Sequence, residues 1–132
     1  MVDERPRNRP TIVATLAATS ITATIYDAGR NYSTDHQARS ACLAALVKDL
    51  TGRGSTRLVI EQDDSLVRSD RHELYRLTRA AGITDVVDYG HQRAHDEPLL
   101  ALPDVAAWCW VRSSDWRRHI EPMLTSVRHI GP

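Results

Sequence analysis

The chain has 132 residues, of which 42% are hydrophobic and 26% charged, a composition typical of one soluble globular domain. Its formal net charge is zero, so global electrostatics favours neither nucleic acid nor an anionic membrane, and any anion site has to come from a local cluster. No apolar run approaches the roughly 18 residues of a membrane span, and residues 1–10 lack the apolar core of a secretory signal. We therefore expect a single cytoplasmic domain, 1–132, without membrane contact and with residues 1–10 as a flexible start.

The two cysteines, Cys42 and Cys109, each lie in an apolar helical pattern. Without a secretory signal, both are expected to be reduced and buried. The sequence contains no CxxC motif and no Cys/His spacing of the kind that binds zinc.

The first predicted elements are a short helix over residues 11–19 and a strand from Ser20 to Tyr26. The strand alternates Ile and Ala with Thr and Tyr, and it carries β-branched residues on both faces. A second helix is predicted from Ala38 to Leu50, where apolar residues form a clear stripe. Thr34 or Asp35 can cap it.

Two further strands are predicted from short apolar runs. Residues 57–60 contain the solid run LVI, which is typical of a buried strand in a parallel sheet. A helix capped by Ser69 or Asp70 then reaches Ala81. The next strand covers residues 85–89, and residues 90–96, GHQRAHD, are predicted to form a loop.

The most apolar stretch, residues 97–116, contains all three tryptophans. Its pattern is helical from Pro103, since proline suits a first helical turn. Residues 113–115, SSD, are expected to break or cap this helix. A last helix is predicted from Trp116 to Val127, with Pro122 as the site of a kink.

Helices and strands therefore alternate along most of the chain. This order predicts an α/β fold with a small, mainly parallel sheet of about three strands flanked by helices. In open sheets of this kind, functional groups gather at the carboxyl ends of the strands. Those ends are Asp27, Glu61 with the following loop acids, and residues 89–96.

Glu61 is the sharpest candidate, because it directly follows a buried run. A carboxylate there can bind Mg²⁺ if a second acid reaches it, and Asp104, at the start of the tryptophan-bearing helix, is the natural second acid. Alternatively, Glu61 caps the loop or pairs with Arg57 or Arg93. Asp104 equally suits the positive end of a helix dipole.

The remaining polar candidates have plain structural interpretations as well. Asp63, Asp64 and Asp70 are typical of loop solvation and helix capping. His91 and His95 are four residues apart, but this spacing has little meaning in a predicted loop. They are interpreted either as phosphate or substrate contacts or as solvated loop residues.

With these residues assembled, the chain resembles a bacterial family known as domain of unknown function 3800, from about Ile21 onward. The resemblance rests on LVIE at residues 58–61 and on EPLLALPDVAAW at residues 97–108. It is supported by Asp70 and Arg71, which open a helix after the acidic loop, and by SDWR at residues 114–117 after the last motif. It implies a ribonuclease-H-like core with Glu61 and Asp104 as metal-binding carboxylates. The family's first strand with its Asp has no counterpart here, so the core is expected to be truncated.

Two functional hypotheses follow from these observations. The first is a metal-dependent nuclease or phosphodiesterase, active or degenerate, that acts on nucleic acid with Mg²⁺ or Mn²⁺. Glu61 and Asp104 would be catalytic and would hold the metal, with Asp63 or Asp64 in support, and His91, Arg93 and His95 would contact the substrate. The second is a non-catalytic module that self-associates through an open sheet edge, with tryptophans at the interface.

Overall fold

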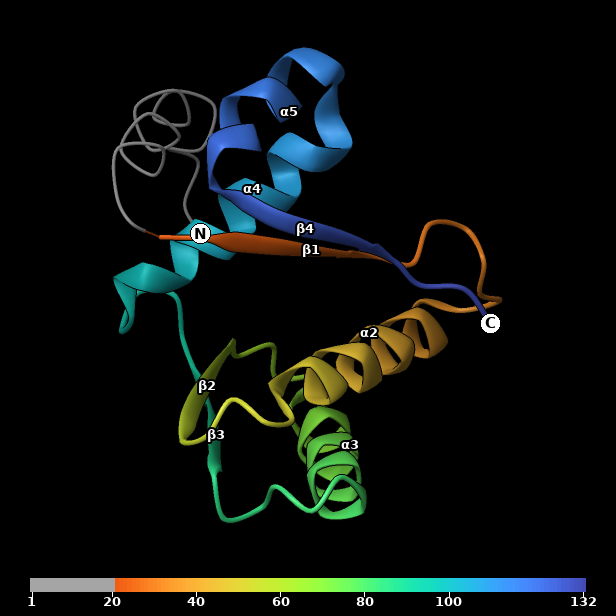
Figure 1. Ribbon diagram of the computed structural model, residues 1–132, viewed down its shortest axis with the longest axis vertical. Helices are drawn as coiled ribbons and strands as arrows, with labels where there is room; N and C mark the ends of the chain where they lie inside the picture. Colours follow the sequence, from red (N-terminus) through yellow and green to blue (C-terminus); the bar gives the residue numbers. More distant parts are fainter. Residues whose placement is uncertain (1–20) are drawn as a thin grey trace. The chain divides into compact units, whose positions relative to one another are not determined.

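The computed structural model describes residues 21–132, so the expected flexible start and the helix over residues 11–19 lie outside the described part. The elements follow one another as helices and strands (Figure 1). They are β1 (Ala23–Asp27), α2 (Asp35–Leu50), β2 (Thr56–Glu61), α3 (Val67–Ala80), β3 (Val87–Gln92), a 3-10 turn (Pro98–Leu100), α4 (Ala101–Arg112), α5 (Ser114–Ile120), a second 3-10 turn (Glu121–Met123) and β4 (Leu124–His129).

The described residues form two compact units. One, here called the α4–α5 unit, contains residues 21–25 and 94–128, and the other, the α2–β3 unit, contains residues 26–93 and 129–132. Two compact units can belong to one domain or to two, so the single domain 1–132 stays a prediction. Within residues 21–132, no helix is long and apolar enough to span a bilayer.

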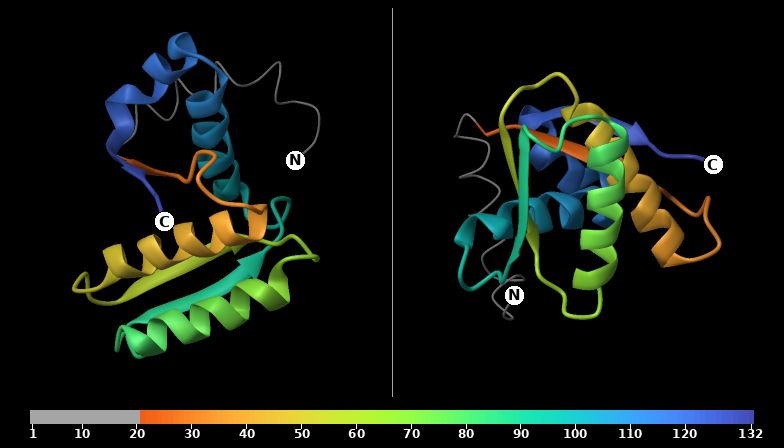
Figure 2. Two further views of the ribbon diagram at one scale, coloured as in Figure 1. Left: turned by 90° about the vertical axis from the view of Figure 1, so that its right-hand side faces the viewer. Right: turned by 90° about the horizontal axis from the view of Figure 1, so that it is seen from below.

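The α2–β3 unit is built on two parallel strands. In the register of β2 and β3, Ile60 lies opposite His91 and Glu61 lies opposite Gln92. Helices α2 and α3 both lie on one face of this pair (Figure 2). The buried run predicted at residues 57–60 is thus confirmed as a strand, and it extends by one residue at each end.

Strand β3 begins and ends later than the sequence pattern predicts. The backbone N–H groups of Val86 and Val87 both donate to the carbonyl of Ile83, so a turn occupies the first part of the predicted strand. Pairing with β2 then continues to Gln92. The expectation that residues 90–92 belong to a loop is therefore wrong, and His91 lies on a strand.

Of the two helix caps predicted for this unit, the cap of α2 is confirmed and the cap of α3 is wrong. Thr34 caps α2, since its Oγ1 accepts a hydrogen bond of 3.1 Å from the backbone N–H of Gln37. Helix α3, however, begins at Val67, and Asp70 lies inside its first turn instead of capping it. The helix ends before Gly82, whose φ of 70° is the left-handed conformation in which glycine commonly terminates helices.

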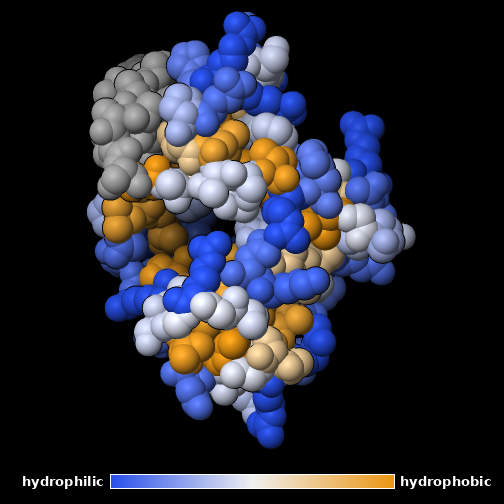
Figure 3. Space-filling model, viewed as in Figure 1, coloured by the Kyte–Doolittle hydropathy of each residue, from blue (hydrophilic) through white to orange (hydrophobic). Residues whose placement is uncertain are grey.

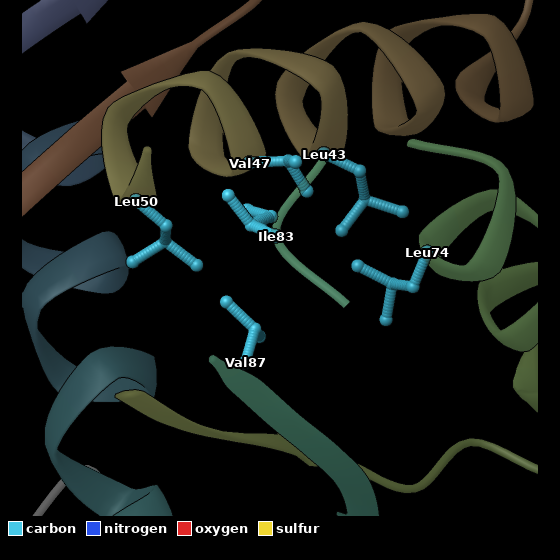
Figure 4. Packing of buried hydrophobic residues seen from close by; sticks show 6 residues of the cluster. All are labelled: Leu43, Val47, Leu50, Leu74, Ile83 and Val87. Carbon is cyan, nitrogen blue, oxygen red and sulfur yellow. The ribbon is translucent and has the colours of Figure 1, made fainter. Parts of the chain in front are cut away.

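The core of the α2–β3 unit lies between the two helices and the strands. Leu74 is completely buried and Val47 is 2% exposed. Burying one such side chain contributes about 1.5–3 kcal/mol, so this cluster is the main source of stability in the unit. Its members point toward one another in Figure 4, and they are Leu43, Val47, Leu50, Leu74, Ile83 and Val87.

The α4–α5 unit has a separate core, formed by Val105, Cys109, Ile120 and Met123. Residues 113–115 separate its helices as the sequence predicts, and Ser113 caps α5, because its hydroxyl accepts a hydrogen bond of 3.3 Å from the backbone N–H of Trp116. The expected helix from Trp116 to Val127 is wrong in its second half.

Helix α5 ends at Ile120, a 3-10 turn containing Pro122 follows, and residues 124–129 form β4. Proline has no backbone N–H to continue a helix. The residues after it, with Thr125 and Val127, favour a strand once a partner strand is present.

The fold is α/β with a small parallel sheet, as the sequence predicts. The single sheet of about three strands that the sequence predicts is not formed by the described chain. It forms two sheets of two strands each, β2 with β3 and β1 with β4. Strand β1 pairs with β4, most of which the residue periodicity predicts to be helical. It is therefore not the third strand of the β2–β3 sheet.

Candidate functional site

The carboxyl ends of β2 and β3 form one edge of the α2–β3 unit. The backbone N–H of Gln62 donates to the carbonyl of Gln92 at 2.8 Å, so the two strands stay paired to their last residues. The loop that follows β2 leads directly into α3. Because the ends of parallel strands meet at the same edge, the polar residues after each strand are brought together, as in other open α/β sheets.

A buried carboxylate, Asp70, joins three elements near this edge. Arg39 of α2 donates from Nε to Oδ1 and from Nη2 to Oδ2, both at 2.8 Å. His91 of β3 places its Nε2 3.1 Å from Oδ2. The side chains of Asp70 and His91 are 2% and 1% exposed, while that of Arg39 is 36% exposed.

This network fixes the charge of Asp70. Burial alone would raise the pKa of Asp70, but hydrogen bonds from Arg39 and His91 outweigh burial and hold the pKa below its usual value. The same hydrogen bonds raise the pKa of Arg39. The pair is therefore ionised at neutral pH, and the two parallel N–H···O bonds hold the guanidinium in one orientation.

The tautomer of His91 follows from the same contacts. An ionised carboxylate can only accept hydrogen bonds, so Nε2 of His91 carries the proton that it donates to Asp70. Its other ring nitrogen, Nδ1, is buried and has no hydrogen-bond partner in the described part of the chain. The arrangement is a carboxylate–imidazole pair in which one ring nitrogen has no partner within residues 21–132.

The sequence assigned Asp70 to loop solvation and capping, and that interpretation missed the network. A signal was present, because Asp70 lies four residues before Leu74 and eight before Thr78, on the side of α3 that is buried. A carboxylate on the apolar stripe of a helix is costly to bury unless it is paired. The partner, Arg39, lies 31 residues away and could not be identified from spacing.

The loop acids have local partners. Asp63 Oδ1 accepts hydrogen bonds from the backbone N–H of Ser65 at 3.0 Å and from its hydroxyl at 2.6 Å, and these bonds lower the pKa of Asp63. Asp64 accepts from Gln62 and from Arg93, each at 2.9 Å, and these contacts lower its pKa. Both acids shape the exposed loop that leads into α3.

Glu61 differs from these acids. It ends β2, its side chain is exposed, and it makes no hydrogen bond or ion pair with any residue in the range 21–132. One sequence interpretation paired it with Arg57 or Arg93, but Arg93 binds Asp64 instead. Glu61 is therefore an exposed carboxylate at the carboxyl edge of the β2–β3 sheet, and its side chain makes no hydrogen bond or ion pair within residues 21–132.

The other candidate residues lie elsewhere. Asp104 is in the first turn of α4 and half-buried, and it belongs to the α4–α5 unit, whereas Glu61 belongs to the α2–β3 unit. The two-carboxylate metal site built on this pair stays a prediction. His95 is exposed beside Asp96, with 3.4 Å between Nε2 and Oδ1, and does not join the network of His91.

A divalent metal site can be assessed from the donor set. Within residues 21–132, no three side chains of His, Cys, Asp or Glu are arranged to hold one ion. Mg²⁺, however, commonly takes one or two carboxylates and keeps several waters. A Mg²⁺ or Mn²⁺ site that uses Glu61 with Asp63 therefore stays a prediction from the sequence.

Compared with protein-family models, with curated proteins and with solved structures, the chain shows no match. The resemblance to the domain of unknown function 3800 family therefore stays an expectation from the sequence.

Proposed function

We propose that the chain is a metal-dependent phosphodiesterase that acts on nucleic acid, with its working edge at the carboxyl ends of β2 and β3. The observation that supports this proposal is Glu61, an exposed and unpaired carboxylate at the end of a parallel strand. The derivation from a truncated ribonuclease-H-like core is part of the proposal. So is the role of Asp104 as a second catalytic carboxylate.

In this proposal, Glu61 holds Mg²⁺ or Mn²⁺, with Asp63 in support. The cation, when bound, supplies the Lewis-acid charge that stabilises phosphodiester oxygens. Arg39 contributes a phosphate contact, because Asp70 occupies only its Nε and Nη2 edge and Nη1 makes no hydrogen bond within the described residues. Arginine presents its remaining N–H groups in a rigid plane, which suits phosphate oxygens.

The decisive test is cleavage of single- and double-stranded DNA and RNA in the presence of Mn²⁺. We expect Glu61→Gln to lower the cleavage rate by more than about 100-fold, since even the outer partners of metal ligands are worth about 10–100-fold. Asp104→Asn tests the second carboxylate in the same assay. Asp85→Asn is the matched control, because Asp85 is an exposed acid before the opposite, amino end of β3.

Each variant is first checked by circular dichroism and thermal unfolding, so that a loss of fold is not taken for a loss of chemistry. Equal cleavage by the wild type, Glu61→Gln and Asp104→Asn would assign the activity to a contaminant and would refute the proposal.

One observation favours a second, non-catalytic function. Each sheet of the described chain has only two strands, so β2 and β3 each have one edge without a strand partner among residues 21–132. Unpaired edges are templates for pairing with another chain. The module would then self-associate, and light scattering would show a mass that increases with concentration. A constant monomer mass at high concentration would rule this function out.

A further inference from the structure

All three tryptophans of the chain lie in α4 and α5, although these helices supply only a small part of the sequence. Trp108 and Trp116 meet edge to face, with ring centroids 4.8 Å apart and planes at 79°. All three rings are partly buried and pack against the core that contains Val105 and Ile120. The indoles are therefore fixed in place by the core and form the base of a surface.

Two exposed arginines lie over two of these rings. The guanidinium carbon of Arg112 lies 5.2 Å from the ring centroid of Trp108, and that of Arg117 lies 4.1 Å from the ring centroid of Trp110. The Nε group of Arg117 also donates to the carbonyl oxygen of Trp110. Each guanidinium thus lies within cation–π distance of an indole, and that of Arg117 is also held by a hydrogen bond.

These two arginines differ from their neighbour Arg118 in making no ion pair within the described residues. Both are exposed, and neither forms an ion pair with any residue in the described range. Arg118 provides the contrast, because its Nη2 binds Oδ1 of Asp115 at 2.8 Å. Although the net charge of the chain is zero, α4 and α5 therefore carry two positive charges that make no ion pair within residues 21–132.

The chemistry of this surface fits a strand of stacked bases joined by phosphates. An arginine whose one face rests on an indole offers the other face to a base and its N–H groups to a phosphate. Single strands are commonly bound by aromatic and arginine planes together with positive charge. A protein partner would need more apolar area, but Val111 is the one large apolar side chain exposed on α4 and α5, and the surface over α5 is largely hydrophilic (Figure 3).

We propose that Arg112 and Arg117, on their tryptophan supports, bind single-stranded nucleic acid. This inference deepens the proposed function, because it names single strands as the substrate. It rests on the proposed function only for the cleavage of the bound strand. Binding itself needs neither Glu61 nor a metal ion. In this inference the indoles of Trp108 and Trp110 pack against the core and support the contact, and the arginines make it.

The test uses a fluorescently labelled oligothymidylate of about 12 nucleotides, within the range of about 4–16 nucleotides covered by known single-strand sites. Its anisotropy is titrated with the full chain in EDTA, so that cleavage plays no part. Intrinsic fluorescence is followed in parallel, since every tryptophan of the chain reports on this surface. We expect saturable binding to the wild type that weakens as salt is raised.

Arg112→Gln and Arg117→Gln are each expected to weaken binding by about 5-fold or more, as the loss of one stacking contact predicts. Arg112→Lys and Arg117→Lys keep the charge but lose the planar stack, so they should fall between the wild type and the Gln variants. Arg118→Gln is the matched control, because this neighbouring arginine is already neutralised by Asp115. Its affinity should stay within about twofold of the wild type.

Wild-type affinity in the double variant Arg112→Gln/Arg117→Gln, or no saturable binding by the wild type at low salt, would overturn the inference. The inference would also be overturned if the tryptophan emission of the wild type shifts with protein concentration alone and that of Arg117→Gln does not. Such a result would identify a second copy of the protein as the partner. Glu61→Gln separates the two proposals. If it binds like the wild type and no protein cleaves, only the phosphodiesterase fails. If the wild type cleaves and the double arginine variant binds single strands as tightly as the wild type, only the inference about the arginines fails.

Discussion

Replacing Asp70 by Asn tests the buried network directly. The substitution keeps the size and shape of the side chain and removes its charge. The asparagine oxygen can still accept one hydrogen bond from Arg39, but its NH₂ group is a donor that would face the other donors, Nη2 of Arg39 or Nε2 of His91. Since the side chain of His91 is 1% exposed, water cannot easily replace the lost acceptor.

The expected loss of stability follows from these contacts. Hydrogen bonds to charged groups contribute about 1.5–3 kcal/mol each, and breaking a fully buried ion pair costs about 3–5 kcal/mol. Arg39 is 36% exposed, so water partly solvates the guanidinium once its partner is gone. We therefore expect the free energy of unfolding to fall by about 2–4 kcal/mol, equivalent to roughly 10 °C in Tm for a chain of this length.

The assay is urea unfolding followed by far-UV circular dichroism. Arg39→Gln and the double variant Arg39→Gln/Asp70→Asn complete a cycle that isolates the coupling between the two side chains. Asp88→Asn is the control, because Asp88 is exposed on β3, and its effect should stay within about 0.5 kcal/mol. An Asp70→Asn protein as stable as the wild type would show that the network contributes nothing to folding and would refute this reasoning.

Four other predictions follow. The folded-state pKa of Asp70 is depressed, so its contribution to stability is fully present above the unfolded value of about 3.9 and is lost as pH falls below it. Urea titrations between about pH 2.5 and 6 should therefore show that the free energy of unfolding falls less steeply with acid in Asp70→Asn than in the wild type. The same pH dependence in both proteins would contradict an ionised Asp70 in the folded state. Thr34→Ala should destabilise the fold by about 1 kcal/mol and Thr34→Asn should not, because the cap of α2 needs only a side-chain oxygen. Leu74→Ala should cost about 2–5 kcal/mol and Leu74→Met less than about 1.5, and equal values would mean that the core of the α2–β3 unit is loosely packed. Cys109, which is fully buried, should react with iodoacetamide only in denaturant, whereas Cys42, whose pKa is raised by burial, should react in the folded protein with a pH midpoint above that of a free thiol.

The elements that the sequence predicts well are those specified by neighbouring residues. The apolar stripe of α2 and its cap Thr34 lie within one helix, and the run at residues 57–60 lies within one strand. The position of Glu61 at the end of that strand followed from the same run. Its lack of an ion pair did not, because that depends on Arg93 turning to Asp64 in the next loop.

The elements that the sequence predicts poorly depend on distant partners. Residues 123–127, MLTSV, have the spacing of a helix face, and their strand conformation in β4 arises from pairing with β1, about a hundred residues earlier in the chain. The Asp70 network likewise joins residues 31 and 21 positions apart. Local periodicity carries no information on which of the chain's many arginines reaches a given buried acid.

The cost of the Asp70 network argues that stability alone does not account for it. Well-packed apolar side chains of similar volume are often as stabilising as a buried ion pair, or more so, because no charge has to leave water. The network also leaves Nδ1 of His91 buried without a partner, which an apolar residue would avoid. Unlike an apolar cluster, the ionic arrangement holds the Arg39 guanidinium in one orientation near the carboxyl ends of the strands. Its Nη1 group makes no hydrogen bond within residues 21–132. The phosphate contact proposed for Arg39 requires such an arginine, on the same edge as Glu61, whose side chain makes no ion pair within residues 21–132.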